Sequence, residues 1–180
     1  MKIEQGWLSV STQLISPNTD HRPDQADISL LVVHNISLPP EQFGGPHIGE
    51  LFCNCLDPDQ HPYFAEIAHL KVSSHLLIDR TGQIMQFVPF QQRAWHAGVS
   101  EFEGRTNCND FSIGIEMEGA DNIAYTDIQY RTLAEVSQTL LQWYPLITKD
   151  RIVGHSDIAP GRKTDPGPAF DWPRYRNALT

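Results

Sequence analysis

The sequence predicts a single α/β domain, spanning residues 1–180, in which a mixed β-sheet is flanked by α-helices. Residues 28–33 are apolar on both alternating faces, which is typical of a central strand. Residues 112–117 alternate between apolar and polar side chains, which predicts a second strand. Residues 126–144 repeat their apolar side chains at helical spacing, and a sheet covered by helices buries both kinds of pattern.

A β-hairpin is expected in the middle of the chain. Residues 72–78 alternate, with Val72, Leu76 and Ile78 on one side. Residues 79–82, Asp-Arg-Thr-Gly, are typical of a turn, and residues 84–88 return as the second strand. A short strand at residues 152–153 is expected directly before Gly154 and His155.

The helix pattern has recognisable ends. Thr126 and Gln129 fit a capping box, in which each side chain accepts from the backbone of the other residue. Pro145 ends the helix, and a shorter helix is expected after Pro168. The proline-rich residues 38–62 and 159–168 are predicted to be long, stiff loops, and ordered loops of this length are often functional.

Composition excludes several classes of protein. The 180 residues suffice for one core, and 40% of them are hydrophobic, which argues against disorder. The net charge of −9 argues against nucleic acid as a partner, because phosphate contacts need clustered basic side chains. The longest apolar run is residues 30–33, too short for a membrane span or a secretory signal. We therefore expect a cytoplasmic protein without a membrane or nucleic-acid partner. The sequence predicts no partner protein, and a monomer is the expected state.

The three cysteines are Cys53, Cys55 and Cys108. An odd number of cysteines in a cytoplasmic chain favours reduced thiols over disulfides. Three thiolates are also one ligand short of a closed structural zinc site.

Two histidines stand where predicted strands end. His34 follows the central run 28–33, and His155 follows the short strand 152–153, so the two side chains converge if these strands are neighbours. Asp165 comes ten residues after His155, in a loop restrained by prolines. Two histidines and one carboxylate are typical of catalytic zinc, which keeps a fourth position for water. The resulting charge of +1 suits amide hydrolysis, because it stabilises an oxyanion.

Two further residues fit the same chemistry. Glu116 shares a strand face with Gly114, so there is room for a substrate beside a carboxylate that can act as general base. Lys163 stands two residues before Asp165, and in an extended loop the two side chains point the same way. Exposed charges are the ordinary alternative for both residues when each is considered alone.

Several strings identify a resemblance that covers residues 28–175. They are residues 33–35, 74–80, 95–98, 111–116 and the loop 154–168. In this order they resemble the zinc-dependent N-acetylmuramoyl-L-alanine amidases, a family that includes the peptidoglycan recognition proteins and the phage T7 lysozyme. The resemblance implies a mixed sheet flanked by helices. It also implies zinc on His34, His155 and Asp165, Glu116 as the base and Lys163 as the oxyanion stabiliser.

Contacts with a muramyl-peptide substrate are also expected from this resemblance. Such a substrate carries carboxylates, for which Lys71 and Arg105 are candidates, with plain surface charge as the alternative. Trp95 either stacks on a sugar ring of the substrate or packs against other side chains of the protein. Asn35 either binds the substrate or shapes a turn. The motif histidines His75 and His96 fit the core or the surroundings of the metal as well as a substrate contact.

The resulting hypothesis is a zinc amidase that cleaves the lactyl-amide bond between 1,6-anhydro-N-acetylmuramic acid and L-alanine in cytoplasmic muropeptides, during peptidoglycan recycling. A cell-wall autolysin is the nearest alternative. A peptidoglycan-binding module without activity is disfavoured, because all five site residues are present. A non-haem iron oxygenase needs a further histidine after position 155, and the chain has none. A zincin is excluded because His-Glu-x-x-His is absent.

Overall fold

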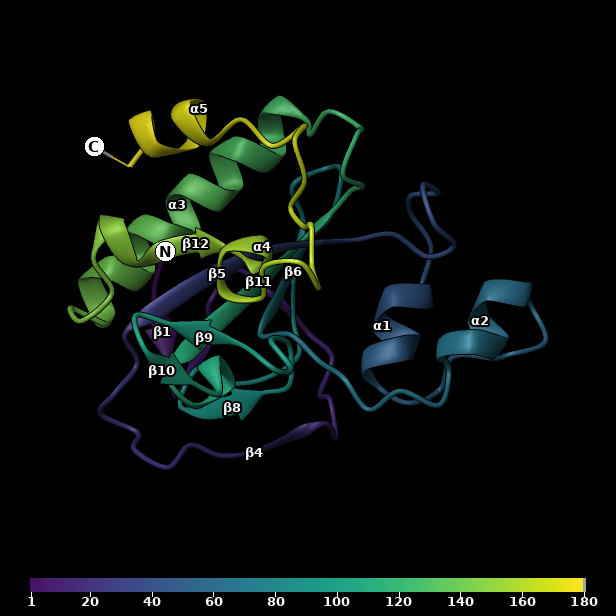
Figure 1. Ribbon diagram of the computed structural model, residues 1–180, viewed down its shortest axis with the longest axis horizontal. Coiled ribbons are helices and arrows are strands. Elements are labelled where there is room, and N and C mark those ends of the chain that lie inside the picture. Colours follow the sequence, from purple (N-terminus) through teal and green to yellow (C-terminus); the bar gives the residue numbers. More distant parts are fainter. Residues whose placement is uncertain (180) are drawn as a thin grey trace.

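A six-stranded mixed sheet organises the computed structural model, which describes residues 1–179 (Figure 1). The strands lie side by side in the order β12-β5-β11-β6-β7-β3. Their bounds are Ile152–Gly154 (β12), Leu30–Ile36 (β5), Ser112–Glu118 (β11), Leu76–Ile78 (β6), Ile84–Gln86 (β7) and Thr12–Gln13 (β3). The fold class predicted from the sequence is confirmed.

The parallel part of the sheet positions the functional residues. Strands β12, β5, β11 and β6 run parallel, whereas β6 and β7 form the predicted antiparallel hairpin. In the pairing of β5 with β11, His34 lies opposite Glu116. In the pairing of β5 with β12, Val33 lies opposite Gly154, so His34 and His155 leave the sheet at the same edge.

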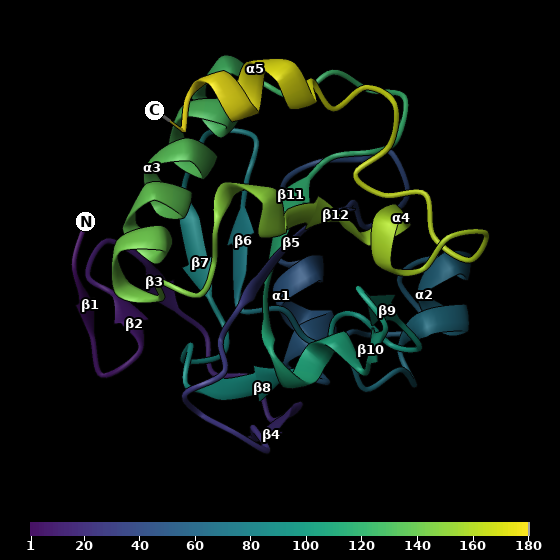
Figure 2. The same ribbon diagram turned by 60° about the vertical axis from the view of Figure 1, so that its left-hand side comes forward.

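Helices cover both faces of the sheet (Figures 1 and 2). Helices α3 (Asp127–Trp143) and α5 (Trp172–Asn177) lie over one face, and α1 (His47–Phe52) and α2 (Pro62–Ile67) lie over the other. The short helix α4 (His155–Ile158) directly follows β12. Residues 108–110 and 149–151 form single 3₁₀ turns. Within residues 1–179, none of the helices is both long and apolar enough to cross a bilayer.

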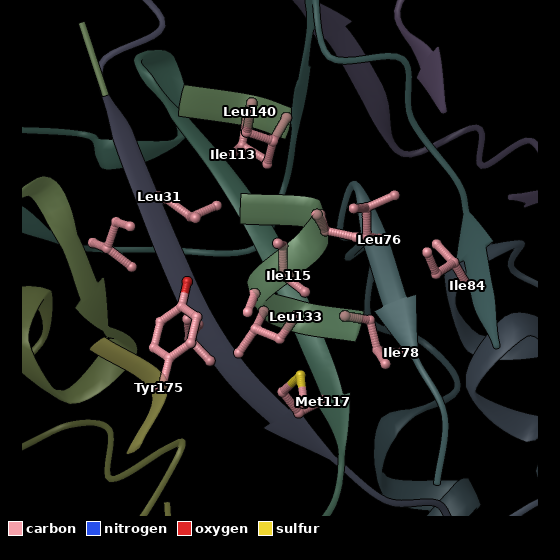
Figure 3. Close-up of a cluster of buried hydrophobic side chains, with 14 of the residues drawn as sticks. Leu31, Leu76, Ile78, Ile84, Ile113, Ile115, Met117, Leu133, Leu140 and Tyr175 are labelled. Atoms are coloured by element: carbon pink, nitrogen blue, oxygen red, sulfur yellow. The ribbon is translucent and has the colours of Figure 1, made fainter. Parts of the chain in front are cut away.

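Alternation along β11 divides its side chains between the two faces. One face carries Ile113, Ile115 and Met117, which pack against Leu133 and Leu140 of α3 (Figure 3). All the residues labelled in Figure 3 are buried. The opposite face of the same strand therefore carries Ser112, Gly114 and Glu116, as the alternation predicted. Small and polar side chains on this face leave space for a site between the sheet and helices α1 and α2.

The capping box of α3 is confirmed. The Thr126 side chain accepts from the Gln129 backbone N–H at 3.2 Å, and Gln129 accepts from the Thr126 backbone N–H at 3.0 Å. The helix ends at Trp143, two residues before Pro145.

Two predictions about element bounds are corrected. The strand expected at 72–78 is only Leu76–Ile78, because Ser73, Ser74 and His75 bond neighbouring loops and strand β11 through their side chains. The segment 38–62, predicted as a loop, contains α1 and the first residue of α2. These helices have six residues each, too few to show a helical period in the sequence.

Three short antiparallel pairs complete the fold and were not predicted, because strands of two or three residues show no clear alternation. They pair β1 (Ile3–Glu4) with β2 (Trp7–Leu8), β4 (Thr19–His21) with β8 (Gln92–Ala94), and β9 (Glu101–Phe102) with β10 (Arg105–Thr106). The three cysteines are free thiols, as the sequence predicted.

Candidate active site

Two histidines and an aspartate meet at the carboxyl edge of β5 and β12. The Nδ1 atoms of His34 and His155 lie 2.9 Å apart, and each lies 3.1 Å from Asp165 Oδ2. Asp165 returns to this edge because its backbone carbonyl accepts a hydrogen bond of 3.0 Å from the Ser156 N–H at the start of α4. The structure thus brings together the three side chains that the sequence predicted to converge.

These three side chains fit a zinc ion. Two imidazole nitrogens and one carboxylate are the donors of many catalytic zinc sites, and ligands of tetrahedral zinc lie about 3.3 Å apart. Burial lowers the pKa of His34 to about 4, so its imidazole is neutral and able to ligate near neutral pH. Burial alone would raise the pKa of Asp165, but hydrogen bonds with His155 and His34 outweigh it and hold that pKa well below its ordinary value.

A small scaffold holds the loop that carries Asp165. The carbonyl of Pro166 accepts from the Tyr125 hydroxyl at 2.8 Å and from Asn35 Nδ2 at 3.1 Å. Asn35 Nδ2 also donates to Asp121 Oδ1 at 2.9 Å. The side-chain amide of Asn35, proposed from the sequence as a substrate contact or a turn residue, therefore ties the end of β5 to the loop after Asp165.

Glu116 lies beside His34 on the neighbouring strand. It is buried, and its Oε2 has no hydrogen-bond partner within residues 1–179. Burial, reinforced by the negative charge of Asp165, raises the pKa of Glu116 well above its ordinary value, and Lys163 opposes this shift. An unpartnered carboxylate with a raised pKa next to a metal site is a strong candidate for proton transfer.

A cavity of about 340 Å³ joins these groups. It is lined by Glu116, by Lys163 and by the three candidate metal ligands His34, His155 and Asp165, hereafter the ligand trio. Lys163 is exposed, so its ammonium can reach a bound substrate. Helices α1 and α2 supply the opposite wall.

The predicted substrate contacts divide into two groups. Asn35 and Trp95 line the cavity. Lys71 is exposed next to two lining residues but is itself outside the lining. Arg105 lies on β10, where its guanidinium pairs with Asp27 at 2.5 Å and sits 3.9 Å from the centre of the Phe111 ring. The structure therefore does not bring Arg105 to the cavity.

Sequence reasoning missed the cavity wall formed by α2. Tyr63, Ile67 and Leu70 line the cavity from this helix and the turn after it. Their spacing of four and three residues fits a helix, but it covers only eight residues directly after the proline-rich segment 38–62, too few to establish a helical period. His96 was left undecided, and its ring forms part of the cavity floor.

A pair of histidines, an ionised aspartate and a protonatable glutamate around one cavity define a metal-dependent hydrolase as the class of protein that this site supports. Comparison with known proteins gives the family. The chain belongs to the N-acetylmuramoyl-L-alanine amidase family, whose model matches residues 24–168.

Relatives of known structure or function support this assignment. The chain is 62% identical to the 1,6-anhydro-N-acetylmuramyl-L-alanine amidase AmpD of Salmonella typhimurium strain SL1344, over 96% of this chain and 92% of the relative. A crystal structure of an AmpD selenomethionine derivative is 58% identical and superposes with a TM-score of 0.97 over all of both chains. The Escherichia coli amidase AmiD, solved with anhydro-N-acetylmuramic acid-L-Ala-D-γ-Glu-L-Lys, is 30% identical with a TM-score of 0.62, over 84% of this chain and 57% of AmiD.

Proposed function

We propose that this protein is a zinc-dependent amidase that cleaves the bond between the lactyl group of 1,6-anhydro-N-acetylmuramic acid and L-alanine, as a step of peptidoglycan recycling. The observation that carries the proposal is the convergence of His34, His155, Asp165 and Glu116 on one cavity. The 62% identity with an amidase named for this substrate supports the choice of bond.

His34, His155 and Asp165 would hold the zinc ion. When bound, zinc supplies Lewis acidity at the scissile carbonyl and makes water a better nucleophile near neutral pH. The role of the trio is to present two imidazole nitrogens and one carboxylate oxygen to the ion.

Glu116 moves the proton. Its carboxylate accepts a proton from the attacking water while the oxygen of that water bonds to the carbonyl carbon. Because burial raises the pKa of Glu116, the carboxyl group can retain this proton and then deliver it to the nitrogen of L-alanine as the C–N bond breaks. The products are a free lactyl carboxylate and a free peptide amine.

Lys163 stabilises negative charge on the carbonyl oxygen. Its ammonium is exposed at the rim of the cavity, two residues from Asp165. A cation placed where charge develops contributes more in the transition state than in the ground state, so it raises kcat.

Trp95 is our candidate for the sugar contact, because its side chain lines the cavity and aromatic rings stack on sugar faces. Asn35 remains a candidate for the peptide part. Lys71 stays a weaker candidate for a substrate carboxylate, and Arg105 is not retained because Asp27 holds its guanidinium. We propose that the enzyme acts as a monomer of one domain in the cytoplasm.

A hydrolysis assay read by mass spectrometry tests this function. Purified protein is incubated with an anhydromuramyl tripeptide or with its ordinary muramyl counterpart. Each substrate is tested in the presence of zinc, in the presence of a chelator, and after zinc has been added back to chelator-treated protein. Release of free tripeptide that stops with the chelator and returns with zinc supports the proposal. Faster cleavage of the ordinary muramyl peptide would favour the autolysin, and saturable binding without release would favour a binding module. Fractionation of cells that produce the tagged protein tests the cytoplasmic location.

A further inference from the structure

The two histidines of the site use their second ring nitrogens differently. His155 Nε2 lies 3.1 Å from the carbonyl of Ala97, to which it must donate. Such a carbonyl is a common partner for a metal-binding histidine, because it fixes the ring and its tautomer. His34 Nε2 instead lies 2.9 Å from another imidazole nitrogen, Nδ1 of His96.

Hydrogen-bond chemistry fixes the proton positions in this pair. A neutral imidazole has one N–H, and His34 Nδ1 faces Asp165 and His155, so the proton of a ligating His34 must lie on Nε2. His96 Nδ1 must then accept, which places the proton of His96 on its own Nε2. That atom lies 3.0 Å from Ser112 Oγ, which completes the chain His34–His96–Ser112.

Packing supports an immobile His96. The His34 and His96 rings meet edge to face, with centroids 4.9 Å apart.

The His96 ring occupies the space that a side chain at position 114 would fill, and Gly114 has none. A Cβ at position 114 would lie 2.5 Å from Cγ and 2.6 Å from Nδ1 of His96. Real Cβ atoms are not found so close to another side chain, so any other residue would displace the ring from His34.

The nearby His75 is a useful contrast. Its Nδ1 accepts from the Gly114 backbone N–H at 3.0 Å, and its Nε2 lies 3.1 Å from the Gln92 carbonyl. His75 therefore supports the backbone of β11, whereas His96 contacts a residue of the ligand trio directly.

We propose that His96 is a positioning residue that holds His34 in the tautomer with Nδ1 free, and that it thereby strengthens zinc binding. The inference rests on the proposed zinc site. The usual partner of a metal-binding histidine is a carboxylate, a backbone carbonyl or water, and here a neutral imidazole takes that place.

Two substitutions at one position separate the hydrogen bond from the volume of the side chain. In His96→Asn, the side-chain oxygen takes the place of Nδ1 and can accept from His34. In His96→Gln, the amide reaches toward Ser112 and the acceptor for His34 is lost. Zinc affinity is measured by competition of each protein with a chromogenic chelator for Zn²⁺, after circular dichroism has shown that each variant is folded.

We expect His96→Gln to raise the Kd for zinc about 10- to 100-fold and His96→Asn to leave it within about threefold of the parent protein. Equal affinities in the parent and in His96→Gln would overturn the inference, as would an equal loss in the two folded variants. If the parent protein itself binds no zinc, the proposed function fails instead.

Nitrogen-15 NMR of the histidine rings of the zinc-loaded protein gives a second readout that does not depend on affinity. In the parent and in His96→Asn, the Nε2 proton of His34 should exchange slowly with solvent, because the side chain at position 96 accepts it. In His96→Gln this proton should exchange about tenfold faster. Equally slow exchange in the parent and in His96→Gln would refute the inference whatever the zinc affinities are.

Discussion

Replacing Glu116 by Gln should make the protein more stable and inactive at the same time. The Glu116 carboxylate is buried, and its Oε2 has no hydrogen-bond partner in the described chain. Leaving a buried polar group unpaired costs about 1–3 kcal/mol, and more for a charged one. Gln has the same shape without the charge, so Glu116→Gln should raise the free energy of unfolding of the metal-free protein by about 1–3 kcal/mol at pH 8.

The pH dependence of this gain follows from the raised pKa of Glu116. Below the ordinary pKa of 4.5, the carboxyl group is protonated in both the folded and the unfolded chain, so the substitution changes little. As pH rises from 4.5 toward the higher pKa of the folded protein, the unfolded chain loses its proton first, and the parent protein loses stability relative to the variant. Urea unfolding of both metal-free proteins at pH 4.5 and pH 8 measures the effect.

Glu118 provides the matched control. It is also buried on β11, two residues further along the same face, but its carboxylate accepts from the backbone N–H groups of Gly44 and Arg80. Glu118→Gln should therefore destabilise the protein at pH 8, because charge-assisted hydrogen bonds are weakened. The reasoning is refuted if Glu116→Gln is no more stable than the parent at pH 8, or if its gain is the same at both pH values. With substrate and zinc, kcat of Glu116→Gln should fall by about 10²- to 10⁴-fold while zinc content is unchanged.

Three further predictions concern the rest of the site. Lys163→Ala should lower kcat by about 10²- to 10³-fold at an unchanged zinc content, and a loss confined to KM would contradict an oxyanion role. In metal-free Glu116→Gln, where the pH effect of Glu116 is removed, the protein should lose stability as pH falls from 6.5 toward 4. The reason is that burial lowers the pKa of His34 to about 4, so the unfolded chain takes up the proton first. Urea midpoints of this variant at pH 7 and pH 5 check this, and equal midpoints would contradict it. Tyr125→Phe should cost about 1 kcal/mol, or about 2–4 °C in Tm, through loss of the hydrogen bond to the Pro166 carbonyl, and an unchanged calorimetric Tm would show that this bond contributes nothing.

The strands before His34 and His155 were predictable, because a strand that is buried on both faces appears in the sequence as an uninterrupted apolar run. His34 and His155 each follow such a run, and the parallel pairing of β5 with β12 is what the convergence required. Glu116 could be placed because side chains alternate strictly along β11. Local rules of this kind need only a few consecutive residues.

Other features depend on contacts between distant residues and left no local signal. Arg105 is of a residue type that often binds substrate carboxylates, yet its guanidinium pairs with Asp27, 78 positions away. Helix α2 forms a cavity wall, but its six residues follow a proline-rich segment that indicated a loop. The hydrogen bond of His96 to His34 spans 62 positions and depends on which ring nitrogens face each other. The sequence identified both histidines without showing that they meet.

The long sequence separation within the ligand trio has a consequence for the order of events in the cell. His34 and Asp165 are 131 positions apart, so a chain still being synthesised holds His34 long before it holds all three of the proposed zinc ligands. At the proposed site, zinc would be captured with full affinity only after Asp165 has been made and β12 has paired with β5. Zinc loading of this site would therefore be a late step in the maturation of the protein, and it would depend on prior assembly of the parallel part of the sheet.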